Sequence, residues 1–326
     1  SMTDFINSPV FICGHPKAGT SLLTALLDGH PAVVAYPEET LFFRRFLPKA
    51  QGKSRQEKLR LAEKYLIHIF EWNQEAPPEH QQNYPDRDYA DISFEEVRNV
   101  MVSLLEEDRP APTDILNAAV LAYGKVTGIL TEKSRLWVEK TPYNALYAET
   151  IFSEWTNAKC IHIVRDPRDN FVSYHRKQPS WTAKVFAYNW VRSTRAGIEN
   201  RDKYGEDRYL ILRFEDLLQE PDKVTHQLAE FLDIEWQETL LRPTRAGDRW
   251  RGNSMFAEKF QAIRTDPIGR WKEHLVPYDL AMIQVISKNL MSVLGYPLAD
   301  FRLSGLRFSQ TIRLFREQMV VWLKSP

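Results

Sequence analysis

The chain has 326 residues, 43% of them hydrophobic and 26% charged, which is enough to bury a full core in one large α/β domain or two smaller ones. Lys plus Arg and Asp plus Glu both number 43, so no global basic excess points to nucleic acid, and any anion site must be local. No apolar run approaches the roughly 18 residues of a membrane-spanning helix, and the first residues show no signal-peptide pattern. The only cysteines, Cys13 and Cys160, lie in apolar runs, which predicts free core thiols and a cytoplasmic location.

The first strong pattern covers residues 9–27. An apolar run at 10–13 predicts a buried strand, a turn-rich loop follows at 14–19, and leucines at helical spacing come next. Such a loop points backbone N–H groups outward at the positive end of a helix dipole, where phosphate or sulfate binds. Lys17 adds a cation, but Thr20 stands where a Walker A loop has its lysine, which disfavours an ordinary nucleoside triphosphatase. A purely structural glycine-rich turn stays open as the alternative.

Strands and helices alternate along the rest of the chain. Further strands are predicted at 33–36, 135–138, 159–164 and 208–214. Helices are predicted at 54–72, 93–107, 113–130, 182–200 and 222–232. This order predicts an α/β fold, a P-loop-like doubly wound parallel sheet flanked by helices, in a single domain over residues 1–326. The helical block at about 45–132 is expected to form a cap, with a substrate-facing or flexible connection at 73–91.

Charged side chains follow two of these strands. Glu38 and Glu39 come after the second strand and predict either an ordinary helix start, since acidic residues favour first turns, or a catalytic carboxylate. Lys140 follows the next strand, at the edge where open α/β sheets bind ligands, and is either a ligand-binding or a solvated loop lysine. Aromatic residues nearby indicate either core packing or an aromatic acceptor: Phe42, Phe43, Phe46, Tyr65, Trp72 and Tyr84.

A second junction between a strand and a helix begins at Arg165. Pro167 suits a first helical turn with Asp166 as N-cap, so Arg165 lies at the strand tip and Ser173 about two turns further on. An arginine and a hydroxyl at one junction can clamp a phosphate, whereas a salt bridge from Arg165 to Asp169 would be merely structural. No His or Cys residues have metal-site spacing, so we expect no metal.

The last 20 or so residues predict an amphipathic helix at about 305–324. Its apolar stripe is formed by Phe308, Ile312, Phe315, Met319 and Trp322, among several Arg and Lys residues. Such a helix suits peripheral contact with a membrane surface or a lipid-like substrate, or packing on its own domain. The sequence leaves both alternatives open.

The two junctions together resemble those of sulfotransferases that use 3′-phosphoadenosine 5′-phosphosulfate (PAPS). Residues 14–23 are similar to the 5′-phosphosulfate loop of that family, and residues 163–174 to its 3′-phosphate segment. Residues 39–43 resemble the segment that supplies the base in heparan sulfate and tyrosylprotein sulfotransferases. Residues 139–142 resemble the lysine segment of the heparan sulfate enzymes, and 212–218 another family segment. The histidine base and the Arg-Lys-Gly segment of the cytosolic enzymes are not evident.

The resemblance implies transfer of a sulfuryl group from PAPS to a hydroxyl, or in second place an amine, of a small-molecule, lipid or carbohydrate acceptor, without a metal. Glu39 would be the base, while Lys17 and Lys140 would stabilise the leaving adenosine 3′,5′-bisphosphate. The implied cofactor contacts are His15, Pro16, Lys17, Ala18, Gly19, Thr20, Ser21, Arg165, Ser173, Phe214, Arg264 and Arg270. The alternatives are a P-loop nucleotide or small-molecule kinase, which would bind ATP or GTP with Mg²⁺, and a nucleotide-binding module without turnover.

Overall fold

The computed structural model describes residues 1–75, 89, 91–246 and 263–325. Its sheet has five strands in the order β2-β3-β1-β4-β5, and every neighbouring pair is parallel. The strands are β1 (Pro9–Cys13), β2 (Val33–Ala35), β3 (Leu136–Lys140), β4 (Lys159–Val164) and β5 (Tyr209–Arg213). The predicted parallel sheet is therefore confirmed, and each predicted strand is present to within about two residues.

Side chains of β1 alternate between two cores, one on each face of the sheet. Val10 and Ile12 pack with helices α2 (Thr20–Asp28), α12 (Phe214–Gln219) and α13 (Pro221–Leu232). Phe11 and Cys13 point into the other core, which includes α8 (Pro112–Thr127) and α9 (Ala148–Glu154). Helices on both faces explain why these strands are continuously apolar. Cys13 and Cys160 are free and buried, as predicted.

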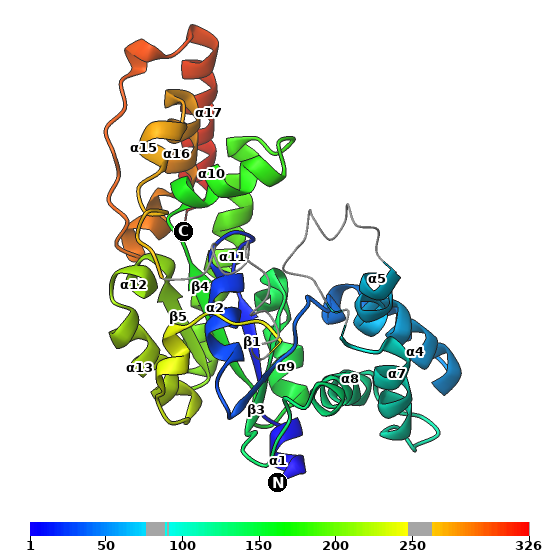
Figure 1. The fold of residues 1–326 in the computed structure, drawn as a ribbon. Helices are drawn as coiled ribbons and strands as arrows, with labels where there is room; N and C mark the ends of the chain where they lie inside the picture. Colours follow the sequence, from blue (N-terminus) through cyan, green and yellow to red (C-terminus); the bar gives the residue numbers. More distant parts are fainter. Residues whose placement is uncertain (76–88, 90, 247–262, 326) are drawn as a thin grey trace.

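Helices fill the described chain between β2 and β3 (Figure 1). They are the π-helices at Phe42–Phe46 and Glu63–Ile67, α3 (Leu47–Ala50), α4 (Arg55–Ala62), α5 (His68–Glu75), α7 (Phe94–Ser103) and α8. Phe42, Phe43 and Phe46 are buried in the core, so these three do not support an aromatic acceptor pocket. Most of the 73–91 connection, including Tyr84, lies outside the described residues.

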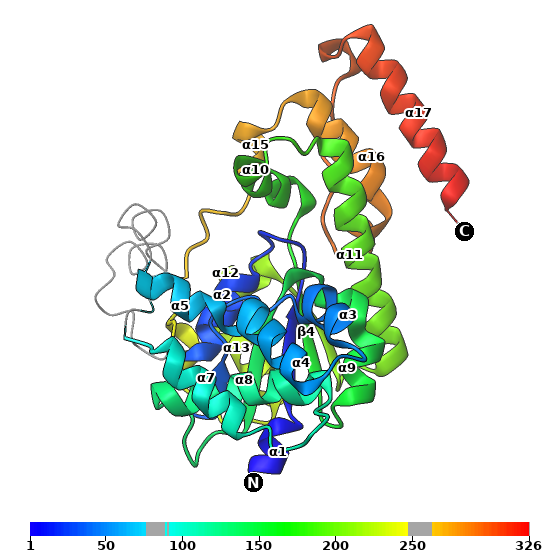
Figure 2. The ribbon, with the colours of Figure 1, turned by 90° about the vertical axis from the view of Figure 1, so that its right-hand side faces the viewer.

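A helical lobe stands beyond the carboxyl ends of the strands, at the end of the molecule opposite α1 (Met2–Ile6) (Figures 1 and 2). It consists of α10 (Pro167–Lys177), the amino-terminal part of α11 (Ala183–Tyr204), α15 (Trp271–His274), α16 (Pro277–Val293) and α17 (Phe308–Lys324). Short 3₁₀ helices occur at Pro142–Tyr147, Glu238–Leu241 and Leu303–Gly305. None of the described helices combines the length and the apolar character that spanning a bilayer requires.

Candidate active site

The loop between β1 and α2 depends on two glycines. Gly14 and Gly19 have φ angles of 147° and 108°, which L side chains rarely adopt. A Cβ on Gly19 would lie 2.4 Å from Cδ2 of Phe214, and one on Gly14 would lie 2.6 Å from the carbonyl oxygen of Ile163. The loop is thus packed directly against the ends of β4 and β5, where no larger residue fits.

The amino end of α2 has the features of an anion site. The first N–H groups of an α-helix, here beginning at Thr20, have no partner within the helix. No side chain caps this helix either. Lys17 precedes them with a φ of 69°, an unusual conformation for a residue with a side chain. A phosphate or sulfate group would satisfy these donors.

His15 supports the loop through its ring. Burial lowers the pKa of His15 to about 4, so the ring is neutral at pH 7. Nε2 accepts a hydrogen bond from the Asn189 amide at 2.7 Å, which leaves Nδ1–H to donate to the Pro16 carbonyl at 2.9 Å. Asn170 donates to the same carbonyl at 2.8 Å. Because these bonds occupy both ring nitrogens, any hydrogen bond from His15 to a bound ligand has to come from its backbone.

Glu39 and Lys140 form an ion pair at the carboxyl ends of β2 and β3. Lys140 Nζ lies 2.7 Å from Glu39 Oε1, and the Glu39 side chain is 39% exposed. Since β3 lies between β2 and β1, these two side chains and Lys17 follow three neighbouring strands. The helix after β2 starts only at Phe42 and has no acidic residue in its first turn. The interpretation of Glu38 and Glu39 as a helix start is therefore wrong.

Glu139, which our sequence analysis did not single out, holds this region together. Its buried carboxylate accepts hydrogen bonds from the Thr40 N–H and hydroxyl at 3.2 and 2.9 Å. Thr141 and Asn144 donate to it at 2.6 and 2.7 Å. Thr40 directly follows Glu39, so Glu139 fixes the backbone that carries the predicted base. The sequence signal is a carboxylate inside an apolar strand, one residue before Lys140.

Glu38 has different partners from Glu39. Its Oε1 accepts hydrogen bonds from the Tyr89 hydroxyl at 2.7 Å and from Arg245 at 2.6 Å. These contacts tie the end of β2 to two segments that are distant in the sequence. Glu38 therefore serves as a structural ion-pair partner, while Glu39 is the more exposed carboxylate.

Arg165 connects the second junction to the loop. Its guanidinium donates to the carbonyls of Lys17 and Pro267 at 2.9 and 3.2 Å and lies 4.8 Å from the centre of the Phe214 ring. Asp169 instead accepts the N–H groups of Gly269 and Trp271, at 2.8 and 2.9 Å. Within the described residues Arg165 and Asp169 form no ion pair, so the structural alternative for Arg165 is wrong.

The remaining predicted contacts lie around this junction. Ser173 is half-buried on α10, Arg264 is exposed, and Arg270 pairs with Asp266 at 2.9 Å. Their part in binding stays a prediction. Arg168, which the sequence analysis missed, is buried between Asp166 and the Trp271 ring, 4.3 Å from its centre.

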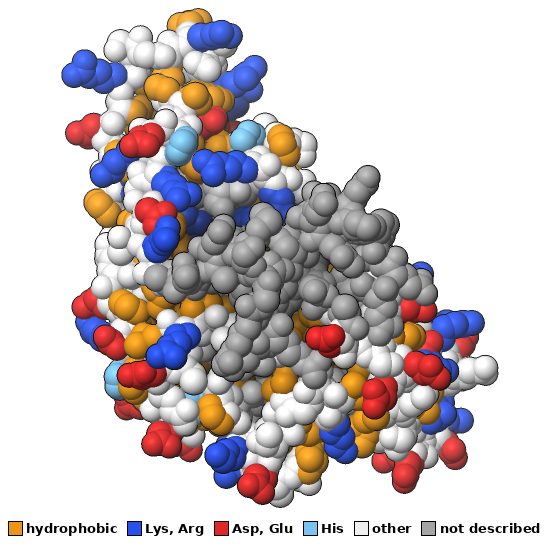
Figure 3. Space-filling model, viewed as in Figure 1, with side chains coloured by type: hydrophobic (Ala, Val, Ile, Leu, Met, Phe, Trp, Pro, Cys, Tyr) orange, Lys and Arg blue, Asp and Glu red, His pale blue; other side chains and the backbone are white. Residues whose placement is uncertain are grey.

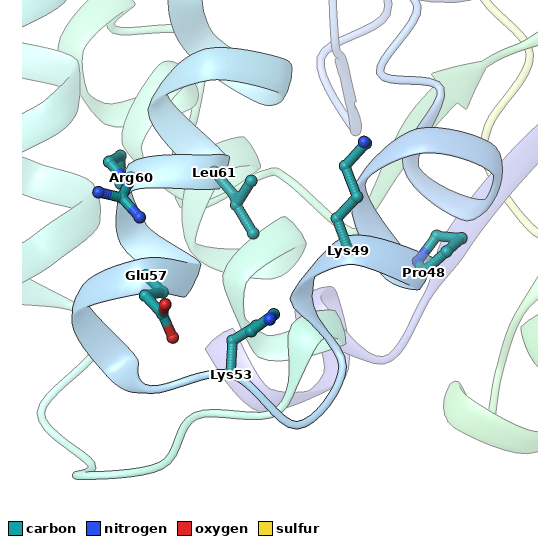
Figure 4. Close-up of a pocket in the computed structure, with 6 residues that line it drawn as sticks. All are labelled: Pro48, Lys49, Lys53, Glu57, Arg60 and Leu61. Atoms are coloured by element: carbon teal, nitrogen blue, oxygen red, sulfur yellow. The ribbon is translucent and has the colours of Figure 1, made fainter.

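A pocket of about 470 Å³ lies elsewhere, between α3 and α4 (Figure 4). Its lining residues are Pro48, Lys49, Lys53, Glu57, Arg60 and Leu61, and it includes none of the predicted site residues. The candidate site is therefore the edge of the sheet where β1, β2, β3 and β4 end. In the part of the chain that the structure describes, no group of His, Cys, Asp or Glu side chains could hold a metal ion.

Comparisons with known proteins identify the family. A profile described as "Sulfotransferase family" matches residues 9–238. An uncharacterized protein of Aquifex aeolicus is 27% identical over 243 residues, covering 72% of this chain and 26% of that protein. Protein-tyrosine sulfotransferase A of Caenorhabditis elegans is 24% identical over 238 residues, covering 71% and 51%. The chain thus spans about half or less of the length of these two relatives.

The sulfotransferase domain of the Synechococcus PCC 7002 olefin synthase has the same fold. Its solved structure superposes with a TM-score of 0.58 and 23% sequence identity, covering 90% of this chain and 96% of that one. The matching profile extends over more than half of the chain, from β1 through α13. The chain belongs to the sulfotransferase family.

Proposed function

We propose that this chain transfers a sulfuryl group from PAPS to a hydroxyl group, with Glu39 as the general base. The observation that carries the proposal is the 2.7 Å pair of Glu39 and Lys140 beside an uncapped helix amino terminus. Sulfuryl transfer needs a base for the acceptor proton and cations for the charge that grows on the leaving phosphate. Three neighbouring strand ends supply these groups.

Different groups of the chain would bind the 5′ and 3′ ends of PAPS. PAPS supplies the activated sulfuryl group when it is bound. The first-turn N–H groups of α2 and the Lys17 ammonium would hold the 5′ end, and Lys140 would stabilise the developing negative charge. Arg165 and Ser173 would hold the 3′-phosphate, because a guanidinium has five N–H donors and its two carbonyl contacts leave others for an anion.

Nucleotide binding separates this proposal from the kinase alternative. Calorimetric titration should give metal-independent binding of adenosine 3′,5′-bisphosphate that is much weaker for AMP, which lacks the 3′-phosphate. A P-loop kinase would instead prefer ATP or GTP with Mg²⁺. The position of Thr20, where Walker A loops have lysine, supports the first outcome.

The acceptor belongs to the same proposal. A hydroxyl of a small molecule, lipid or carbohydrate remains the proposed class, with an amine in second place. The Caenorhabditis elegans relative is named for protein tyrosine, so a phenolic hydroxyl is a sensible first acceptor. An acceptor screen should therefore compare a tyrosine peptide, an aliphatic alcohol and a sugar.

Two free buried cysteines support the proposed cytoplasmic location.

Replacing Glu39 tests the proposed base. Glu39→Gln should lower turnover about 10²- to 10⁴-fold, while the affinity for adenosine 3′,5′-bisphosphate changes little. Glu63→Gln is a matched control, because Glu63 also forms an ion pair, with Arg98, but lies among the helices between β2 and β3. Near-normal turnover of Glu39→Gln, measured with the acceptor found in the screen, would show that another group is the base.

A further inference from the structure

Helix α17 turns an apolar stripe toward solvent. We define this stripe as Phe308, Ile312, Phe315, Met319, Trp322 and Leu323, whose exposed fractions range from 45% to 82%. Their spacing of three and four residues places them on one face of a helix, over roughly 23 Å of its length. Single exposed apolar residues are common, but a continuous row of large ones marks an interaction surface.

Contacts on another face of α17 fix its rotation. Leu314 is 4% exposed and belongs to the core that α17 shares with α11 and α16. Glu317 is 6% exposed, accepts a hydrogen bond from Tyr188 at 2.6 Å and pairs with Lys184. The packing alternative of the sequence analysis thus describes this face of α17 but leaves the stripe uncovered.

The segment around the stripe is strongly basic, although the whole chain has no net charge. Residues 301–326 contain one acidic residue, Glu317, which is already paired. Their basic residues are Arg302, Arg307, Arg313, Arg316 and Lys324. Figure 3 shows Lys and Arg side chains among hydrophobic ones at the outer end of the lobe, seen from the side on which α15 and α16 lie in front of α17. This combination is complementary to a surface that is anionic outside and apolar beneath.

We propose that α17 docks on an anionic lipid bilayer. The apolar stripe lies at the boundary between headgroups and acyl chains. Arg316 borders the stripe on the helix surface, and Arg313, exposed further round the helix, has a side chain long enough to reach toward the lipid phosphates. Both α17 and the loop between β1 and α2 lie at the carboxyl-end side of the sheet (Figures 1 and 2). Docking would therefore attach the molecule through the lobe at its active-site end.

A second copy of the chain fits the stripe less well. Pairing two α17 helices through their apolar faces would bring the cations beside the stripe close to one another, and like charges at short range are unfavourable. No acidic side chain of residues 301–326 other than the buried Glu317 could offset them. The charge pattern therefore favours lipid over self-association.

Vesicle sedimentation with the full chain tests the proposal without reference to catalysis. We expect binding to phosphatidylcholine vesicles that contain about one third phosphatidylglycerol, and weak binding to phosphatidylcholine alone. Phe315→Asp should abolish binding, whereas Met2→Asp, on an exposed residue at the opposite end, should not. The double variant Arg313→Gln and Arg316→Gln should bind about thirtyfold more weakly.

Two controls make the outcome decisive. Lys125→Gln with Lys133→Gln removes two exposed charges near the amino ends of the strands and should leave sedimentation unchanged. Thermal unfolding of Phe315→Asp should match the wild type, because that side chain is 56% exposed. Equal binding to both vesicle types, or full binding of Phe315→Asp, would overturn the proposal. A dimer that Phe315→Asp dissociates, without vesicle binding, would assign the stripe to a second copy.

Discussion

Replacing Glu139 by glutamine should loosen the backbone segment that carries the predicted base, Glu39. Three of the four donors to this carboxylate converge on Oε1, and the fourth, the Asn144 amide, reaches Oε2 at 2.7 Å. In Glu139→Gln the carboxamide oxygen can take the Oε1 position. Its NH₂ group then faces the Asn144 amide, and two donors meet where one charge-assisted bond existed.

The magnitude follows from this geometry. A buried donor left without an acceptor costs about 1 to 3 kcal/mol. Burial raises the pKa of Glu139, so removing its charge offsets part of that cost, and we expect a net loss of about 1 to 2 kcal/mol. The midpoint of thermal unfolding should then be about 1.5 to 3 °C lower. Because Thr40 adjoins Glu39, kcat should also fall by at least about tenfold, with KM for the donor nearly unchanged.

Glu215→Gln is the matched control for Glu139→Gln. Glu215 is also buried, but its closest donors, the Asp166 N–H at 3.0 Å and the Tyr296 hydroxyl at 2.8 Å, both reach Oε1. Glutamine can keep both bonds, so this variant should lose neither stability nor turnover at pH 7. If Glu139→Gln matched the wild type in both unfolding temperature and kcat, the positioning role of Glu139 would be refuted.

Three further predictions concern the pH dependence of stability, the loop between β1 and α2, and the proposed binding of the 3′-phosphate by Arg165. Burial raises the pKa of Glu215 to about 7 from 4.5, so the native state binds this proton more tightly than the unfolded chain. Its stabilising contribution is full below pH 4.5 and is lost as the pH rises through 7. In denaturant titrations the free energy of unfolding of Glu215→Gln should therefore rise by about 3 kcal/mol relative to the wild type between pH 5 and 8. A difference that stays constant with pH would contradict this. Gly19→Ala should destabilise the folded protein by about 1 to 3 kcal/mol in thermal unfolding. Gly52→Ala should cost less, since Gly52 has a φ of 75° but no atom within 4 Å of an added Cβ. Equal losses of stability in the two variants would refute the crowding of Gly19 by Phe214. Arg165→Ala should lower the calorimetric affinity ratio of adenosine 3′,5′-bisphosphate to AMP by about 10- to 150-fold, and an unchanged ratio would limit Arg165 to supporting the loop.

Local patterns in the sequence were sufficient for the architecture. Apolar runs separated by amphipathic helical segments predicted all five strands and their parallel arrangement, because such periodicities depend on near neighbours in the chain. The same reasoning located the glycine-rich loop and Arg165 at strand ends. Family resemblance, rather than periodicity, pointed to Glu39 and Lys140 as partners in one site.

Only the tertiary structure decided which polar groups meet. Glu139 and Thr40 are 99 positions apart in the chain, and no short-range pattern reveals that one accepts two hydrogen bonds from the other. The neutral state of His15 likewise depends on burial and on Asn189, 174 positions away.

The sequence determined that α17 would be amphipathic, but not which of its faces would be buried. An apolar stripe normally packs inward because burial removes it from water. Here Leu314 and Glu317 occupy the contact with the rest of the lobe, and the larger apolar side chains remain outside. That choice depends on the complementary surfaces of α11 and α16, which exist only once the chain has folded.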